Sequence, residues 1–395
     1  MNRARFLASA AGTALVTAHG TRAAFAQSTV QPILPASPYT PTLRFAVVCP
    51  QSGPDTGYGK QLLAGVRGAV EELNRERLLN APLLLYDAYD DQNTTSTATV
   101  QASFATSNPT TLAVIGHLSE AATYVAEPAY ANAQIALIVP TVTDDRITNR
   151  GYRNVFRLPV KDSDEGALLA RCVIGDGAKA PVIATQDGDY GPTVAAGFVR
   201  GAGARHVVAP VVTFPLQQPE LSGVADAILA HAPDCVVLAG NVLDMGPLVK
   251  MLRAKAYTGR LAATQGFFDP ETLKLDPKEI EGLVVSTNAP YYAFAPSAQR
   301  NVQLYQQQYG ALSPVAAYGY AAVQLVSLAV QRTSASDRLS LVRAIATGGN
   351  YTTITGSYTF GASGDVVDPN CYFYRVTNGK FTYDRQAHPS GFMLK

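Results

Sequence analysis

The sequence is poor in the residues that most often build metal centres and nucleophilic catalytic sites. Its 395 residues include only four cysteines and five histidines, and no tryptophan. It contains no HExxH pair, no cysteine spacing typical of zinc, no GxSxG turn and no GxxxxGKS/T loop. Together these absences favour a binding protein over an enzyme, and they predict no metal site.

Charge is also scarce. Charged residues make up 15% of the chain against 47% hydrophobic residues, and the formal net charge is +1. This balance predicts a well-buried globular protein and offers no basic surface for nucleic acid. The chain is too long for one ordinary hydrophobic core, so its length suggests two domains.

We expect the cysteines, His117 and the clustered acids to have structural roles, in preference to catalytic or metal-binding ones. We expect most of the cysteines to be buried and reduced, although four of them allow three full pairings and an oxidising compartment would permit a bridge. His117 is expected to hold its turn as a neutral ring through a backbone hydrogen bond, in preference to acting as a general base. Asp87, Asp90 and Asp91 follow an apolar run, where a solvated turn is favoured over a metal site. The cysteines are Cys49, Cys172, Cys235 and Cys371.

The N-terminus has the layout of a secretory signal peptide. Arg3 and Arg5 precede the moderately apolar stretch 6–18, and Ala24-Phe25-Ala26 forms a small-x-small cleavage site. We therefore expect a signal peptide over residues 1–26, cleaved near Ala26. Residues 27–42 are rich in Pro, Ser and Thr and are interpreted as a flexible leader, and the rest is expected to be exported.

From residue 44 onward, short apolar runs alternate with helical patterns. One series runs from 44 to 139, and a second of similar length runs from 164 to 265. Strands that alternate with helices are typical of parallel α/β structure. The sequence therefore predicts two α/β lobes with a cleft between them, onto which the later helices 297–310 and 314–332 pack.

Two strand-to-helix turns in succession offer hydroxyl groups. Ser119 lies in AVIGHLSEAAT (113–123), and Thr141 and Thr143 lie in ALIVPTVTDDRIT (136–148). Backbone N–H groups at a helix start carry partial positive charge, so such turns suit a carboxylate or another compact acceptor. Helix capping explains one such turn, but two at consecutive strand ends favour a ligand cleft.

Aromatic residues follow other predicted strands. Tyr58 lies in the first strand-to-helix turn, Tyr190 follows QDGD in the second series, and Phe267 and Phe268 follow a later strand. Aromatic walls with a few placed polar groups are typical of small-molecule pockets. These four are singled out among 20 tyrosines and 14 phenylalanines because α/β clefts bind at the carboxyl ends of strands.

Several segments carry a resemblance to a known family through their order and spacing. They are SGPDTGYGKQLLAGVRGAVEELN (52–74), VIGHLSEAAT (114–123) with IVPTVTDD (138–145), GYRNVFRLPVKDSDEG (151–166) and DGDYG (187–191). The chain resembles the type I periplasmic solute-binding proteins of ABC importers, specifically the branched-chain amino acid (Leu/Ile/Val) binding group. The resemblance covers nearly all of the chain beyond the leader.

The resemblance implies a fold of two doubly wound α/β lobes joined by three hinge crossings, near 158–161, 285–288 and 353–356. Lobe 1 would comprise residues 43–159 plus 287–354, and lobe 2 residues 160–286 plus 355–395. The lobes would close on a small-molecule ligand, and the closed form would dock on the permease membrane subunits of an ABC transporter. A periplasmic monomer without cofactor or turnover is implied.

The resemblance also places a ligand site. The family's serine for the ligand carboxylate falls at Glu120, directly after Ser119, and which of the two faces the cleft stays open. The family's tyrosine and glutamate for the ligand ammonium fall at Asn241 and Gln265. A neutral amide is a poor partner for a buried ammonium, so the ligand is expected to differ. The implied site residues are Tyr58, Leu118, Ser119, Glu120, Thr141, Val142, Thr143, Tyr190, Asn241, Gln265 and Phe267.

Two ligand classes remain open. If Glu120 faces the cleft, it can replace the lost anionic partner and the ligand is an amino acid bound from the other side. Alternatively the ligand is an amide, a polar neutral metabolite or an aromatic compound without ammonium, and Glu120 complements the helix dipole. Both are favoured over a plain Leu/Ile/Val ligand. Competing functions are a ligand-sensing module of the same fold that signals to a partner protein, and an exported enzyme that uses the same cleft.

Overall fold

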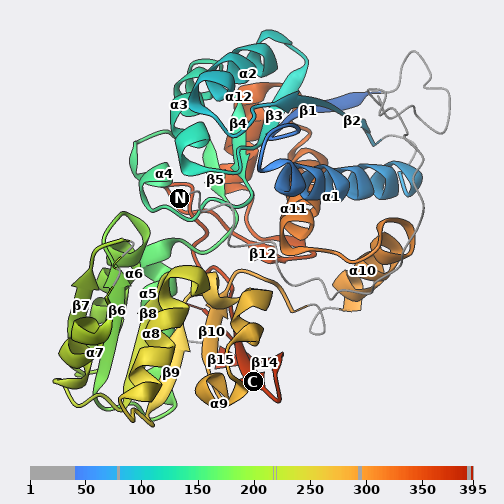
Figure 1. Cartoon of the computed structure of the whole chain (residues 1–395). Coiled ribbons are helices and arrows are strands. Elements are labelled where there is room, and N and C mark those ends of the chain that lie inside the picture. Colours follow the sequence, from blue (N-terminus) through green and yellow to red (C-terminus); the bar gives the residue numbers. More distant parts are fainter. Residues whose placement is uncertain are drawn as a thin grey trace.

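The chain folds into two α/β lobes, as the sequence predicts (Figure 1). The computed structural model describes residues 41–77, 81–216, 218, 220–291, 296–388 and 393–394. The expected signal peptide, and all but the last two residues of the expected leader, lie outside these ranges. The division into two lobes has a physical basis in the packing, because separate hydrophobic clusters form around two separate sheets.

Lobe 1 is built on a five-stranded parallel sheet in the order β2-β1-β3-β4-β5. Helices α1, α11 and α12 cover one face of this sheet, and α2 and α3 cover the other. Both faces of a strand such as TLAVIG are therefore buried, which explains its unbroken apolar run. The elements are β1 Thr42–Cys49, α1 Thr56–Arg75, β2 Leu83–Asp90, α2 Thr95–Ser107, β3 Thr111–Gly116, α3 Glu120–Asn132, β4 Ala136–Val139, α4 Arg146–Asn149, β5 Val155–Arg157, α10 Pro296–Tyr309, α11 Pro314–Thr333 and α12 Arg338–Thr347, with a β-hairpin of β11 Tyr351–Thr353 and β12 Gly356–Tyr358.

Lobe 2 contains an eight-stranded sheet in the order β15-β14-β13-β10-β9-β8-β6-β7. Strands β7, β6, β8, β9 and β10 are parallel, and the last three strands of the chain extend the sheet antiparallel. Its elements are α5 Asp162–Gly175, β6 Pro181–Gln186, α6 Tyr190–Gly203, β7 Val211–Phe214, α7 Ser222–Leu229, β8 Cys235–Ala239, α8 Val242–Ala254, β9 Arg260–Ala263, the short helices Gln265–Phe267 and Pro270–Lys274, α9 Pro277–Ile280, β10 Val284–Thr287, β13 Cys371–Thr377, β14 Lys380–Ala387 and β15 Met393–Leu394.

The parallel strands of the two lobes follow the same order. In lobe 1 the first strand lies between the second and the third, and in lobe 2 β6 lies in the same way between β7 and β8. In open parallel sheets, ligands bind beyond the carboxyl ends of the strands where the order reverses. The topology therefore points to the loops after β1 and β3 in lobe 1, and after β6 and β8 in lobe 2.

The lobe boundaries stay a proposal, which the packing refines. Leu158 packs in the lobe 1 core and Val160 in the lobe 2 core, within the first expected crossing. Ala289 still packs in lobe 2, so we propose that the second crossing follows it instead of ending at residue 288. The expected third crossing, 353–356, is the turn of the β11–β12 hairpin, and the lobe 1 core continues to Val366. We propose that this crossing lies between Val366 and Cys371.

Asn288 connects the crossings to both lobes. Its side-chain Oδ1 accepts a hydrogen bond from the Val160 backbone N–H at 3.0 Å, and its Nδ2 donates to Gln265 Oε1 at 3.0 Å. Its carbonyl accepts from the hydroxyl of Tyr318 on α11, also at 3.0 Å. One fully buried residue therefore links the first crossing, lobe 2 and a lobe 1 helix.

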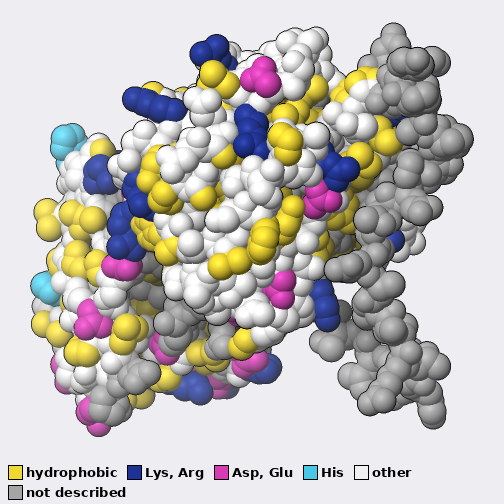
Figure 2. Space-filling model, turned by 90° about the horizontal axis from the view of Figure 1, so that it is seen from above, with side chains coloured by type: hydrophobic (Ala, Val, Ile, Leu, Met, Phe, Trp, Pro, Cys, Tyr) yellow, Lys and Arg dark blue, Asp and Glu magenta, His cyan; other side chains and the backbone are white. Residues whose placement is uncertain are grey.

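No single helix among the described residues is long and apolar enough to cross a membrane, and α10 and α11 meet that test only as a pair bent by 118°. On the face shown in Figure 2, basic, acidic and hydrophobic side chains are interspersed across the described residues, without one sign of charge prevailing.

Buried Glu127 on α3 should make the stability of lobe 1 depend on pH. Its carboxylate accepts from Arg150 at 2.6 Å, but burial raises the pKa of Glu127 to about 7 despite that guanidinium. The unfolded chain releases this proton near pH 4.3, so the free energy of unfolding falls as the pH rises from about 4 to 7. Because the Arg150 side chain is 34% exposed, water reaches the pair and lessens the desolvation of the carboxylate, so we expect a loss of about 2 kcal/mol.

The Glu127→Gln variant should lack this loss. Urea denaturation at several values between pH 4.5 and 7.5 would measure the difference from wild type. The control is Glu271→Gln, which removes a partly exposed carboxylate paired only with a surface lysine. If Glu127→Gln and Glu271→Gln follow the same pH profile, the buried carboxylate is not the cause.

Candidate functional site

A cavity of about 480 Å³ lies between the two lobes, at the strand ends that the topology indicates. Lobe 1 lines it with the start of α3 and the turn between β4 and α4. Lobe 2 lines it with the loops that follow β6, β7 and β8. The lining residues are Glu120, Ala121, Tyr124, Asp144, Arg146, Gln186, Asp187, Gly188, Asp189, Tyr190, Gly191, Leu216, Ala239, Gly240, Asn241 and Asp244.

Ser119 and Glu120 have different places at the start of α3. Ser119 is 3% exposed and is the N-cap, where its hydroxyl accepts from the Ala122 backbone N–H at 3.4 Å. Glu120 is the first helical residue, and it lines the cavity. Capping therefore uses the hydroxyl of Ser119 and leaves the carboxylate of Glu120 as the group beside the cavity.

The turn after β4 contributes Asp144 and Arg146. The Asp144 carboxylate accepts from the Arg146 backbone N–H and from its guanidinium, with Nη2–Oδ2 at 2.6 Å. Thr143 lies in the same turn, and its carbonyl accepts from the backbone N–H of Asp162 at the start of α5. Thr141 Oγ1 is buried and has no hydrogen-bond partner among the described residues, which makes this hydroxyl a candidate ligand contact.

An ion pair joins the two sides of the cavity. Arg146 Nη2 of lobe 1 lies 2.8 Å from Asp189 Oδ2 at the start of α6 in lobe 2. Both side chains are more than half exposed, so the pair contributes at most about 1 kcal/mol. An interaction of this size can hold the lobes in register without preventing their separation.

Tyr190 forms part of the lobe 2 wall and is supported from behind by Glu165. The Tyr190 hydroxyl donates to Glu165 Oε2 at 3.0 Å, while Ser286 Oγ and the Gln265 backbone N–H donate to Oε1 at 2.7 and 2.9 Å. Burial raises the pKa of Glu165, although the three donors oppose that rise, and burial also keeps the pKa of Tyr190 well above its ordinary value. Tyr190 therefore stays a hydrogen-bond donor that is fixed in one orientation.

Glycine allows the backbone of this wall to pack closely. A Cβ added to Gly191 would lie 1.9 Å from Thr185 Oγ1, so a larger residue would push the start of α6 away from β6. Asn241 caps α8 on the same wall, where its Oδ1 accepts from the Asp244 backbone N–H at 3.0 Å and its amide donates to the Asp244 carboxylate.

The remaining site residues expected from the sequence lie away from the cavity lining. Leu118 packs in the lobe 1 core, Val142 in the cluster on the opposite face of that sheet, and Phe267 in the lobe 2 core with 0% exposure. Tyr58 is partly buried against the lobe 1 core. Gln265 is 3% exposed, and its side chain faces Asn288 near the crossings.

Sequence reasoning did not single out Tyr124, Asp144, Arg146, Asp187, Asp189 or Leu216 as site residues. Tyr124 lies one turn after Glu120 on α3, and the acids directly follow β4 and β6, so helix and strand spacing could have indicated them. Leu216 comes from the loop after β7, where the sequence has no comparable signal.

His117 and the acids after β2 differ from the sequence expectation. His117 is fully buried and pairs with two side chains, through Nδ1 with Asp91 Oδ2 at 2.6 Å and through Nε2 with the Tyr130 hydroxyl at 2.9 Å. The backbone hydrogen bond expected for His117 is therefore wrong, and the solvated turn is wrong for Asp91, which is 0% exposed, whereas Asp87 and Asp90 are partly exposed. The Asp90 carboxylate instead accepts from the loop at Gln51 and Ser52.

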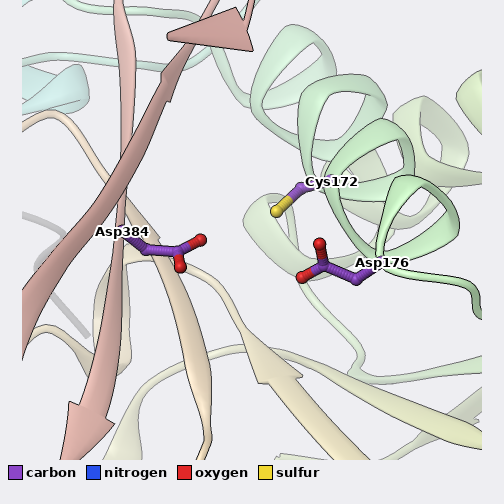
Figure 3. Close-up of side chains that lie close together, drawn as sticks. All are labelled: Cys172, Asp176 and Asp384. Carbon is purple, nitrogen blue, oxygen red and sulfur yellow. The ribbon is translucent and has the colours of Figure 1, made fainter. Parts of the chain in front are cut away.

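Cys172, Asp176 and Asp384 lie close enough together to suggest a metal site (Figure 3). Arg385 is 4% exposed, and its guanidinium pairs with Asp176 at 2.7 Å and with Asp384 at 2.5 Å; Arg375 pairs with both acids as well. Burial raises the pKa of Cys172 to about 12, so it stays a thiol. The carboxylates are neutralised by arginine, and this cluster fits an ion-pair network that ties α5 to β14.

The four cysteines are buried and free, consistent with the expectation that most are reduced. A disulfide therefore has no part in positioning the cavity.

Comparison with known proteins identifies the family. The family model described as "Periplasmic binding protein" matches residues 42–380. A Leu/Ile/Val-binding protein of Rhizobium johnstonii is 22% identical over 343 residues, which cover 86% of this chain and 92% of that protein. A leucine-specific-binding protein of Salmonella typhimurium is 24% identical over 329 residues, which cover 82% and 88%.

Solved structures share the fold. A leucine-binding protein from Thermotoga maritima has a TM-score of 0.72 at 22% identity and covers 88% of this chain and 99% of its own. A solute-binding protein of an ABC transporter from R. palustris, in complex with benzoate, has a TM-score of 0.68 at 19% identity and covers 89% and 97%. One of these neighbours is named for leucine and the other is in complex with benzoate, although both share the fold.

Proposed function

We propose, since this chain belongs to the periplasmic binding protein family, that it is the extracytoplasmic solute-binding component of an ABC importer. It captures a small amino-acid-like, amide or aromatic ligand between its lobes by hinge closure, and it delivers that ligand to a membrane permease. The proposal includes a periplasmic location after removal of residues 1–26, a monomeric state, and binding without a cofactor or catalytic turnover.

The observation that carries this proposal is the cavity between the lobes. It lies at the carboxyl ends of parallel strands in both lobes, and lobe 1 supplies five and lobe 2 eleven of the residues that line it. The exposed ion pair Arg146–Asp189 joins the two walls. Such a cavity opens and closes when the lobes move about their crossings, which is the hinge motion of binding proteins.

The proposed contacts follow from the geometry. Tyr190 and Tyr124 supply aromatic surface, while Glu120 and Asn241 supply polar groups from opposite lobes. The hydroxyl of Thr141 is a further proposed contact because it is buried without a partner among the described residues. Ser119, Thr143 and Gln265 are proposed to shape the turns around the ligand, and Tyr58, which lies outside this cavity lining, to support lobe 1 at the start of α1.

Native mass spectrometry of the freshly purified full-length product tests the proposal. A small molecule that is retained under native conditions and released on denaturation would support it, and mass and fragmentation would identify that molecule. The same molecule should then require this protein for uptake, measured in a strain that carries or lacks its gene. Chemical conversion of the released molecule by the protein would contradict a pure binding role.

A further inference from the structure

The cavity wall carries far more negative than positive charge. Among the described residues that line it, the acids are Glu120 and Asp144 of lobe 1 and Asp187, Asp189 and Asp244 of lobe 2, and Arg146 is the one basic residue. Since Arg146 can neutralise one carboxylate, the wall as a whole is strongly negative near neutral pH.

Hydrogen bonds and ion pairs fix the positions of Asp144, Asp187, Asp189 and Asp244 on the cavity wall. Arg146 is shared between Asp144 and Asp189. The carboxylate of Asp187 accepts from the Leu216 backbone N–H at 2.6 Å, and that of Asp244 accepts from the Asn241 amide.

The distribution of charge between the lobes matters for closure. Acids stand on both walls, so closing the cleft brings like charges together in a cavity from which water is partly excluded. Like charges repel more strongly when solvent screening falls. A cation between the walls converts that repulsion into attraction, so binding and closure are coupled through charge.

The uncharged part of the cavity wall determines which kind of ligand body can fit. Tyr190 is 9% exposed at the cavity, and Leu216 and Ala239 add apolar surface on the same side. The faces of tyrosine rings also attract cations. A cavity of about 480 Å³ suits a small organic molecule.

On the basis of the proposed function, we infer that this cavity takes an organic cation, an ammonium or guanidinium group on a small apolar body, and rejects ligands whose only charge is a carboxylate. The acids of both lobes recognise the cationic group, and the Tyr190 side of the cavity contacts the apolar body. This assigns a ligand class of opposite charge to the benzoate in the R. palustris neighbour.

Three probes of nearly the same size but different charge test the inference by titration calorimetry. These are benzylamine, benzamide and benzoate, with L-leucine as a zwitterion. We expect benzylamine to bind at least 10-fold more tightly than benzamide, and benzoate to bind most weakly. The affinity for benzylamine should fall as NaCl rises from 20 to 500 mM, because salt screens the attraction.

Variants connect this preference to the named acids. Glu120→Gln and Asp187→Asn should each lower the affinity for benzylamine by about 10-fold, which corresponds to about 1.4 kcal/mol. Asn at 187 keeps an oxygen that can accept from Leu216 N–H, so the loop is retained. The control Glu271→Gln removes a surface acid outside the cavity lining and should bind as wild type does.

The outcomes separate this inference from the proposed function. Benzamide, benzoate or leucine binding as tightly as benzylamine would overturn the cationic ligand class and leave a binding protein. If none of the probes binds, the co-purified molecule decides: an amine or guanidine supports the inference, and any other molecule overturns it. If no probe binds and no molecule co-purifies, both proposals fail.

Discussion

Replacing Arg157 with leucine should lower the free energy of unfolding by about 3 to 5 kcal/mol, because it removes one partner of a buried ion pair. The Arg157 side chain is 1% exposed and lies 2.7 Å from Asp365. It also donates to the Asp144 carbonyl and to Thr148 Oγ1, each at 2.5 Å. The substitution therefore leaves Asp365 with weaker partners, such as the Thr148 hydroxyl and the more distant Lys161. It also releases the turn that carries Asp144 and Arg146 to the cavity.

The size of this loss should depend on pH. Burial alone would raise the pKa of Asp365, but the guanidinium of Arg157 and the Thr148 hydroxyl outweigh it and lower that pKa. A lowered pKa in the folded state means that the carboxylate adds stability above its unfolded value of about 3.9, and that this stability is lost as the pH falls through the folded value. The difference between wild type and Arg157→Leu should therefore shrink below pH 4.

Urea denaturation between pH 3 and 7 would measure this difference. Arg153→Leu is the matched control, since Arg153 is an exposed arginine near β5 that donates to a backbone carbonyl, and it should change stability by no more than about 0.5 kcal/mol. Adding Asp365→Asn to Arg157→Leu should recover part of the loss. Equal effects of the two arginine substitutions would show that the buried pair is unimportant.

Replacing Tyr190 with alanine should weaken ligand binding by about 10- to 100-fold, which is about 1.4 to 2.8 kcal/mol. The ring forms part of the cavity wall, and its hydroxyl is held by Glu165. Truncation also leaves a gap in the lobe 2 cluster and takes one donor from Glu165, so stability should fall by about 3 kcal/mol.

The Tyr190→Phe variant separates these two effects. It keeps the ring at the cavity and removes only the hydrogen bond to Glu165, so affinity should fall by less than 10-fold. Calorimetry with the molecule released in native mass spectrometry would give the affinities, and circular dichroism would establish that each variant is folded at the titration temperature. An unchanged affinity for folded Tyr190→Ala would place the ligand elsewhere.

The sequence predicted the parts of this fold that depend on local pattern. The run TLAVIG at 111–116 indicates a strand buried on both faces, and the Ser119-Glu120 pair indicates a capped helix start. Two such series were enough to predict two parallel α/β lobes and to single out Tyr190, whereas Glu120 and Asn241 came from the family resemblance; all three line the cavity.

The remaining features depend on contacts between residues far apart in the chain. The sequence around Arg157 does not indicate its ion pair with Asp365. In the same way, the sequence around His117 does not indicate its contact with Asp91. Phe267 follows a strand in the same way as Tyr190, but a short helical turn at 265–267 leads its ring into the lobe 2 core. The negative charge of the cavity also arises from loops of both lobes, which lie far apart in the sequence.

The lobe 1 core has a consequence for the order in which the protein can fold. Its first strands, such as the one that contains Phe45, pack against helices α11 and α12, which follow the parallel strands of lobe 2 in the sequence (Figure 1). Ribosomes add roughly 5 to 20 residues per second, so these helices emerge on the order of tens of seconds later. During that interval lobe 1 cannot close its core, whereas the parallel strands and helices of lobe 2 are already available. The growing chain therefore carries an unfinished first lobe through most of its synthesis.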